Sequence, residues 1–150
     1  SSFTKKIKKV INSRKNNDFL VIARIESFIL GKDIKDALKR ANAYSKAGSD
    51  AILIHSKEKN TKQIFSFARE FKKSKYFKPM VAVPSTYSQV KEQELIKNGF
   101  KIVIYANHLL RAAYPAMKNA AKSILINERS YQLEKKIIPI KEIINLIKEK

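Results

Sequence analysis

The chain of 150 residues is long enough for one domain with a hydrophobic core, and its hydrophobic content of 44% is too high for a disordered protein. It contains no cysteine, which excludes disulfides and thiolate metal sites and favours a reducing compartment. No apolar run approaches the roughly 20 residues that cross a bilayer, and the start lacks the apolar segment of a signal peptide. We therefore expect a cytoplasmic protein with no membrane partner.

The formal net charge of +19 would attract nucleic acid, anionic lipid or acidic metabolites. The lysines are scattered, however, and no stripe interleaves them with aromatic residues. We interpret them as a solvated surface and expect no nucleic-acid partner. The alternative is a basic, non-enzymatic module that binds nucleic acid or a protein, which predicts tight binding with a steep dependence on salt.

Helical and strand-like patterns alternate along the chain. The segment before Phe19 has a helical pattern, and four short apolar runs follow that are typical of buried parallel strands. These runs are Phe19–Ala23, Ala51–Ile54, Met80–Val83 and Ile102–Ala106. The helical patterns between and after them cover residues 34–44, 64–71, 90–98, 109–124 and, at the end, about 140–149.

Turn and cap residues support these boundaries. Gly48 and Gly99 each stand between a helix and a strand, where left-handed backbone ends a helix. Asp33 and Thr61 stand where helix N-caps belong. The resulting order repeats a strand and a helix four times, which predicts a parallel sheet with right-handed crossovers.

Two architectures fit this order: a small doubly wound sheet, or four consecutive units of a (β/α)8 barrel. The three glycines form neither G-x-G-x-x-G nor a P-loop, which favours the barrel. A complete barrel needs about 250 residues, so the chain would carry the first or the last four units, and trailing helices suit the end of a barrel. We predict a single domain over residues 1–150, with four strand–helix units at about 19–126. A half-barrel with two open sheet edges and exposed apolar surface should dimerise or aggregate.

Polar side chains stand at the carboxyl ends of the predicted strands, where parallel α/β folds hold their active sites. Arg24 follows the first apolar run, and Glu26 lies on the same face two residues later. The carboxylate can therefore orient the guanidinium for bidentate anion binding. The other strand ends carry His55, Ser56, Ser85, Asn107 and His108.

Each of these residues also has a purely structural interpretation. Arg24 and Glu26 can form an ion pair at a rim, His55 can be a hydrogen-bonded rim histidine, and the pair after the fourth strand can cap a helix. Their coincidence at one edge favours a basic, polar rim that binds a small anion such as a phosphate or phosphonate. The residues expected to bind this anion are Arg24, His55, Ser56, Ser85, Asn107 and His108, with Glu26 behind Arg24.

Acidic residues are nearly absent from these strand ends. Glu26 is the only carboxylate there, so the chain is expected to contribute no metal site of its own. No aspartate follows a strand to complete a Ser-His-Asp triad. Metal ligands, if the reaction needs them, would lie outside this chain.

Several stretches resemble the phosphoenolpyruvate mutase and phosphonopyruvate hydrolase branch of the isocitrate lyase superfamily. The clearest are Val21–Glu26, Ala47–Lys57 and Tyr105–Ala112. Val83–Ser85 and Ile140–Ile143 are also similar to it, so the resemblance covers nearly the whole chain in one register. The lyases of the superfamily have other residues at the histidine and Asn-His positions.

The resemblance implies the C-terminal half of a (β/α)8 barrel, strands five to eight. Members of this branch interconvert phosphoenolpyruvate and phosphonopyruvate in phosphonate biosynthesis, or hydrolyse phosphonopyruvate. The resemblance implies that Arg24 and His55 are catalytic residues that hold the phosphoryl group.

The resemblance also implies a Mg²⁺ ion on the pyruvate enolate, with its carboxylate ligands and a gating loop in an N-terminal half-barrel preceding Ser1. That half is an expected partner, and the family's exchange of its last barrel helix implies a homo-oligomer. The mutase is the leading function, the hydrolase is the second, and a carbon–carbon lyase is the third.

Overall fold

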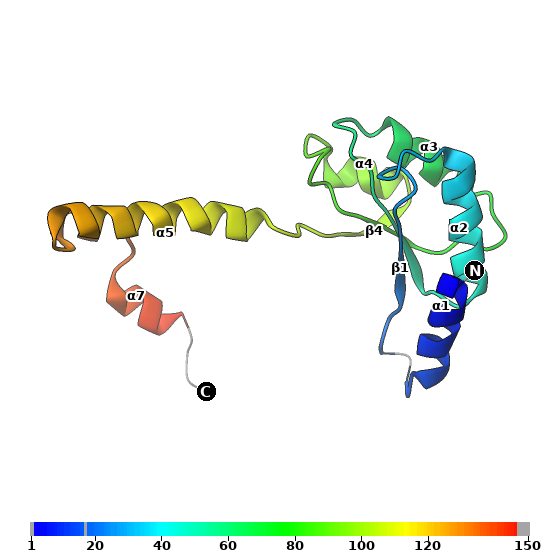
Figure 1. The fold of residues 1–150 in the computed structure, drawn as a ribbon, viewed down its shortest axis with the longest axis horizontal. Coiled ribbons are helices and arrows are strands. Elements are labelled where there is room, and N and C mark those ends of the chain that lie inside the picture. Colours follow the sequence, from blue (N-terminus) through cyan, green and yellow to red (C-terminus); the bar gives the residue numbers. More distant parts are fainter. Residues whose placement is uncertain (1, 17, 147–150) are drawn as a thin grey trace. The chain divides into compact units, whose positions relative to one another are not determined.

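Four parallel strands alternate with helices in the computed structural model, which describes residues 2–16 and 18–146 (Figure 1). The predicted alternation of strands and helices is confirmed. The elements are α1 (Ser2–Ser13), β1 (Ile22–Ile25), α2 (Ile34–Lys46), β2 (Ala51–Ile54), α3 (Lys62–Phe71), β3 (Met80–Ala82), α4 (Glu92–Lys97), β4 (Phe100–Val103), α5 (His108–Asn127), α6 (Tyr131–Glu134) and α7 (Ile140–Asn145).

The chain divides into two compact units, Ser1–Ala106 and Asn107–Lys150. The first unit contains the sheet and α1 to α4, and the second contains α5 to α7. The prediction of one domain over residues 1–150 stays a prediction.

The strands lie in the order β1-β2-β3-β4, and each pairs in parallel with its sequence neighbour. Within the described residues, β1 and β4 are therefore the two edges of the sheet. Sequential parallel order is what repeated right-handed strand–helix units produce, in a barrel as well as in an open sheet.

The predicted ranges of the first and fourth strands are wrong at both ends, since these strands end at Ile25 and Val103, and the third strand ends one residue early, at Ala82. The first strand begins at Ile22, not Phe19, because pairing starts where Ile22 meets Ala51, while Phe19 is 61% exposed ahead of the sheet. The fourth strand begins at Phe100, whose partner is Met80, rather than at residue 102. Apolar runs mark the strands, but hydrogen-bonded neighbours decide where the strands begin.

The core lies between one face of the sheet and the helices. Alternate strand residues such as Ala23, Ile25 and Ile52 point to this face and are almost fully buried. From α3, Phe67 stacks on Phe71 with ring centroids 5.4 Å apart, and both are fully buried. Each such side chain contributes about 1.5–3 kcal/mol by leaving water.

The opposite face of the sheet carries the intervening strand residues. Leu53 and Val81 are register partners that form a second, smaller apolar cluster on this face. At the two edges, Ile22 and Ile102 remain 37% and 36% exposed. Arg24 belongs to this face as well, because it is the register partner of Leu53.

The predicted turn and cap residues lie at their predicted positions, but Thr61 does not cap its helix through its side chain. Gly48 and Gly99 have backbone φ angles of 107° and 91°, a region that side chains disfavour. The carboxylate of Asp33 caps α2 by accepting from the backbone N–H of Asp36 at 2.9 Å. Thr61 occupies the N-cap position of α3 but makes no capping hydrogen bond through its side chain.

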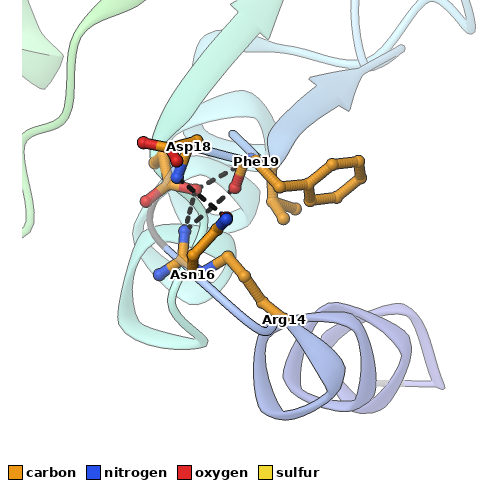
Figure 2. Close-up of polar contacts among 6 residues, drawn as sticks. Arg14, Asn16, Asp18 and Phe19 are labelled. Atoms are coloured by element: carbon orange, nitrogen blue, oxygen red, sulfur yellow. Dashed lines mark hydrogen bonds and ion pairs between the residues drawn. The ribbon is translucent and has the colours of Figure 1, made fainter.

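A polar clamp fixes the chain at the amino edge of the sheet. The Arg14 guanidinium donates to Asp50 at 2.9 Å and to the carbonyl of Phe19 at 3.2 Å, and Figure 2 shows Arg14 reaching toward Phe19. The same Asp50 oxygen accepts from the backbone N–H of Val21 at 2.8 Å. The clamp therefore joins the end of α1 to the starts of β1 and β2.

The second unit has no buried residue in α5, α6 or α7. Leu109 is 85% exposed and Leu125 is 79% exposed, although both lie on the long helix α5. The predicted terminal helix at about 140–149 is present as α7, and its residues 147–149 lie outside the described residues. Among the described helices, none is long and apolar enough to span a membrane.

Candidate active site

Arg24 and Glu26 form an ion pair at the carboxyl end of β1. Arg24 is the third residue of this strand, and Glu26 follows its last residue. The Nε of Arg24 donates to Oε1 of Glu26, and the side chains remain 50% and 40% exposed. Because only Nε is engaged in this pair, the terminal nitrogens of the guanidinium can face an anion.

His55 follows β2 directly and lies beside this pair. Since Ile25 and Ile54 are register partners, the positions after them, Glu26 and His55, stand at the same level on neighbouring strands. His55 also lies on the face of Arg24, two residues beyond Leu53. The structure therefore brings together three residues that the sequence predicted for one site.

The electrostatics of His55 reflect these neighbours. Burial lowers the pKa of His55 below its ordinary value of 6.5, the charge of Arg24 lowers it further, and Glu26 raises it. The ring is therefore neutral at pH 7, with one N–H to donate. Its Nδ1 is buried and has no hydrogen-bond partner among the described residues.

Ser56 is fully buried next to His55. Its hydroxyl donates to Oε1 of Gln63 at 2.7 Å and accepts from the backbone N–H of Glu58 at 3.1 Å. The role of Ser56 as a substrate ligand stays a prediction, and the structure shows its hydroxyl engaged within the protein.

Ser85 lies in the turn after β3 and is half-buried, with its backbone N–H donating to the carbonyl of Val83 at 2.8 Å. The next residue, Thr86, donates its hydroxyl to the carbonyl of Ser56 at 2.7 Å. The loop after β3 therefore contacts the loop that carries His55. A substrate contact by Ser85 stays a prediction.

Asn107 and His108 stand at the start of the second unit. Asn107 occupies the N-cap position of α5 without a capping hydrogen bond from its side chain, and His108 is the first residue of that helix. Their predicted contact with the substrate stays a prediction, and they are placed here only within their own unit.

Metal ligands do not gather at this site. Within residues 2–16 and 18–146, no group of three or more His, Asp or Glu side chains could hold a metal ion. Glu26, the carboxylate at the rim, is already paired with Arg24. The residues present therefore do not fit a Mg²⁺ site, which usually needs carboxylate oxygens beside its waters.

Sequence reasoning missed a second buried serine at this edge. Ser27, 1% exposed, donates to Asp36 of α2 at 2.7 Å, and Arg40 donates to the same carboxylate oxygen at 2.7 Å. These two hydrogen bonds lower the pKa of Asp36. The spacing of Asp36 and Arg40, four apart on a helix, was a signal for their pair, but nothing local indicated Ser27.

Comparison with known proteins gives one consistent result. The phosphoenolpyruvate phosphomutase family model matches residues 1–125. The phosphoenolpyruvate phosphomutase of Tetrahymena pyriformis is 39% identical over 146 residues, which are 97% of this chain and 48% of that protein. The phosphonopyruvate hydrolase of Variovorax sp. (strain Pal2) is 36% identical over 145 residues, 96% of this chain and 49% of that protein.

Solved structures agree with the sequence relatives. The phosphoenolpyruvate phosphomutase structure from Streptomyces platensis subsp. rosaceus superposes with a TM-score of 0.88 at 37% identity, over 96% of this chain and 49% of that one. A phosphonopyruvate hydrolase structure superposes with a TM-score of 0.87 at 36% identity, over 96% and 50%. This chain thus spans about half the length of its curated relatives, and it belongs to the phosphoenolpyruvate phosphomutase family.

Proposed function

We propose that this chain is the phosphoryl-binding half of an enzyme that interconverts phosphoenolpyruvate and phosphonopyruvate. The observation that carries the proposal is the placement of Arg24 and His55 on one face, at the carboxyl ends of neighbouring parallel strands. The family relationship supports the reaction class, since relatives of 32–39% identity carry the name phosphoenolpyruvate phosphomutase.

The side chains suit the chemistry of phosphoryl transfer. Such transfers pass through a loose, metaphosphate-like state in which positioning and charge stabilisation supply most of the catalysis. Arg24 would hold the phosphoryl oxygens through its terminal nitrogens, with Glu26 fixing the plane of the guanidinium. His55 would donate from its neutral ring to another phosphoryl oxygen. The P–C bond of phosphonopyruvate would break to leave the pyruvate enolate, and the enolate oxygen would then form the P–O bond of phosphoenolpyruvate.

A buried ring nitrogen of His55 lacks a hydrogen-bond partner among the described residues, which supports the binding of a further group at this site. A buried ring nitrogen without a hydrogen bond costs free energy, about 1–3 kcal/mol in typical cases. The Nδ1 of His55 is such an atom within the described residues. A substrate oxygen, or a group from the rest of the enzyme, would remove this cost on binding.

Magnesium would be supplied with ligands from elsewhere in the enzyme. One structure of phosphonopyruvate hydrolase was solved with oxalate and Mg²⁺. Because the described residues of this chain do not fit such a site, we propose that the carboxylate ligands belong to the other half of the barrel.

The partners follow from the half-length match. We propose that these four strands are strands five to eight of a (β/α)8 barrel, completed by an N-terminal half. The exposed apolar residues of α5, such as Leu109 and Leu125, support a homo-oligomer in which another subunit covers this helix.

We propose a cytoplasmic location, a small anionic substrate, and no nucleic-acid or membrane partner.

Phosphonopyruvate hydrolysis is the second candidate, because a hydrolase matches the chain as well as the mutases do, at 36% identity. In a hydrolase, the same arginine and histidine would hold the phosphoryl group while water attacks it. The two functions would differ in whether water can reach the phosphoryl group. The residues of this half would not control that access alone.

Phosphorus NMR separates these functions. The complete protein, or this chain mixed with a separately expressed N-terminal half, is incubated with Mg²⁺ and phosphonopyruvate. A phosphate-ester signal from phosphoenolpyruvate is the expected result. Inorganic phosphate with pyruvate and no ester would assign the hydrolase instead. No change in a sample that binds phosphonopyruvate would contradict both functions.

A further inference from the structure

Buried serines at the amino and carboxyl ends of the strands differ in their hydrogen bonding. The buried polar residues in the described part of the chain are Ser27, Ser45, Ser49 and Ser56. The hydroxyls of Ser27 and Ser56, which follow β1 and β2 at the carboxyl edge, are both hydrogen-bonded. The hydroxyls of Ser45 and Ser49, which precede β2, have no partner among the described residues.

Ser56 ties the end of β2 to the start of α3. Its hydroxyl bridges two groups, donating to Gln63 in the first turn of α3 and accepting from the backbone N–H of Glu58. Both groups would lose this partner if the hydroxyl were removed. The bridge therefore fixes the path of the backbone directly after His55.

The carbonyl of Ser56 is fixed from a third direction. It accepts the hydroxyl of Thr86 at 2.7 Å, from the loop after β3. On the other side of His55, Ile54 is fully buried and paired with Ile25 in the sheet. His55 is thus held between a strand residue and a serine that is bound on both its side chain and its backbone.

We propose that Ser56, with Gln63 and Thr86, is a positioning residue that orients His55 toward the phosphoryl group. This inference rests on the proposed function, and it replaces direct substrate contact as the role of Ser56. A side chain displaced by about 1 Å from its productive geometry can lower turnover by roughly 100-fold. Ser56 would therefore matter to the reaction without touching the substrate.

Steady-state kinetics of the complete protein test this role. Ser56→Ala and Thr86→Val should each lower kcat, by roughly 10- to 100-fold for the serine and less for the threonine, while KM changes little. Thr86 is exposed and valine has its shape, so this variant tests the proposal even if Ser56→Ala does not fold. Gln63→Ala should behave like Ser56→Ala, and Gln63→Glu should restore kcat because its carboxylate still accepts the serine hydroxyl.

Ser49→Ala is the matched control. Ser49 is as buried as Ser56 and lies before the same strand, but its hydroxyl has no partner among the described residues. It should retain the kcat of the wild type. Equal losses in Ser49→Ala and Ser56→Ala, or wild-type kcat in both Ser56→Ala and Thr86→Val, would overturn the proposal.

Ring NMR of the 150-residue chain gives a readout that does not depend on turnover. The sequence has two histidines, so the imidazole signals of His55 and His108 are easily separated by a His108→Gln reference. In Ser56→Ala, the pKa of His55 should rise toward its ordinary value as the loop relaxes and burial decreases, while Arg24 and Glu26 still act on the ring. In Ser49→Ala it should not move.

Kinetics and the His55 titration together distinguish a failure of the proposed function from a failure of the positioning role of Ser56. If the wild-type enzyme turns over neither phosphonopyruvate nor phosphoenolpyruvate, the proposed function fails, and the His55 titration alone decides the positioning role. If the wild type turns over but the His55 pKa is unchanged in Ser56→Ala, the function stands and the positioning role is overturned.

Discussion

The amino ends and the carboxyl ends of the strands each carry an arginine–carboxylate pair, and the two pairs differ in exposure. At the amino ends, the side chains of Arg14 and Asp50 are 17% and 27% exposed. At the carboxyl ends, those of Arg24 and Glu26 are 50% and 40% exposed. The same pair of functional groups is therefore enclosed at the amino ends and open to solvent at the carboxyl ends.

The partners of the two pairs differ as well. Arg14 binds the carbonyl of Phe19 (Figure 2), and Asp50 accepts from a second donor, the backbone N–H of Val21. The pair at the amino ends of the strands therefore helps to hold the fold together. At the carboxyl ends, the charge of Arg24 instead lowers the pKa of His55. From this difference we expect the Arg14–Asp50 pair to contribute to stability and the Arg24–Glu26 pair to contribute to activity.

Arg24→Ala should give the largest effect. Loss of a charged group that stabilises a transition state typically costs about 100- to 1,000-fold in turnover, and we expect a loss in this range. The free energy of unfolding should change by less than about 0.5 kcal/mol, because exposed ion pairs contribute little. Phosphorus NMR kinetics and denaturant unfolding measure the two quantities, and wild-type turnover would end the assignment of Arg24.

Asp50→Ala should give the opposite profile. It removes an acceptor from Arg14 and from the backbone of Val21, which should lower the free energy of unfolding by about 2 kcal/mol. The kcat of the folded protein should be unchanged, and Asp50→Asn should lose less because it retains one oxygen acceptor. A large fall in kcat at unchanged stability would break the distinction between the edges.

Gly48→Ala should destabilise the amino edge by a smaller amount, about 1–2 kcal/mol. Gly48 has a φ of 107°, and an added Cβ would lie 3.2 Å from the side chain of Ile11 in α1. Gly31→Ala is the control, since Gly31 has a φ of 68° with no atom within 4 Å of an added Cβ. Thermal unfolding should show a larger loss for Gly48→Ala, and equal losses would exclude the contact with α1.

The smallest effect should be a pair of opposite shifts in the titration of His55. Removing the positive charge in Arg24→Ala should raise the pKa of His55, and removing the negative charge in Glu26→Gln should lower it. Because the lowered pKa favours the neutral ring in the folded state, stability should fall as pH decreases through 6.5 and then level off below the pKa of the folded protein. Ring NMR measures both shifts. Shifts of the same sign would contradict the electrostatic effect of the Arg24–Glu26 pair on His55.

Much of the fold could be predicted from local patterns. The apolar runs identified all four strands, and Ala51–Ile54 was predicted with its observed boundaries. Gly48 and Gly99 marked the ends of helices because few other residues tolerate positive φ. The starts of β1 and β4 were wrong, since Ile22 and Phe100 begin strands only where a neighbour in the sheet binds them.

Some contacts of the candidate site could also be predicted from local sequence patterns, and others could not. Arg24 and Glu26 were predicted to pair because side chains two apart share a strand face, and parallel strands were predicted to bring His55 to the same edge. The contact of Thr86 with Ser56 spans 30 residues and leaves no local pattern.

The sequence by itself therefore determined the order of strands and helices, the turns, and the residue types available for binding an anion. These depend on periodicity and backbone preference, which act over a few residues. Only the tertiary structure decided which polar side chains are engaged in buried contacts within the protein and which remain exposed. Arg14 and Asp50 are 36 positions apart and become a closed clamp, whereas Arg24 stays half-exposed beside His55. Burial and hydrogen-bond partners come from segments distant in the chain, and they separate a stabilising arginine from one that can bind a substrate.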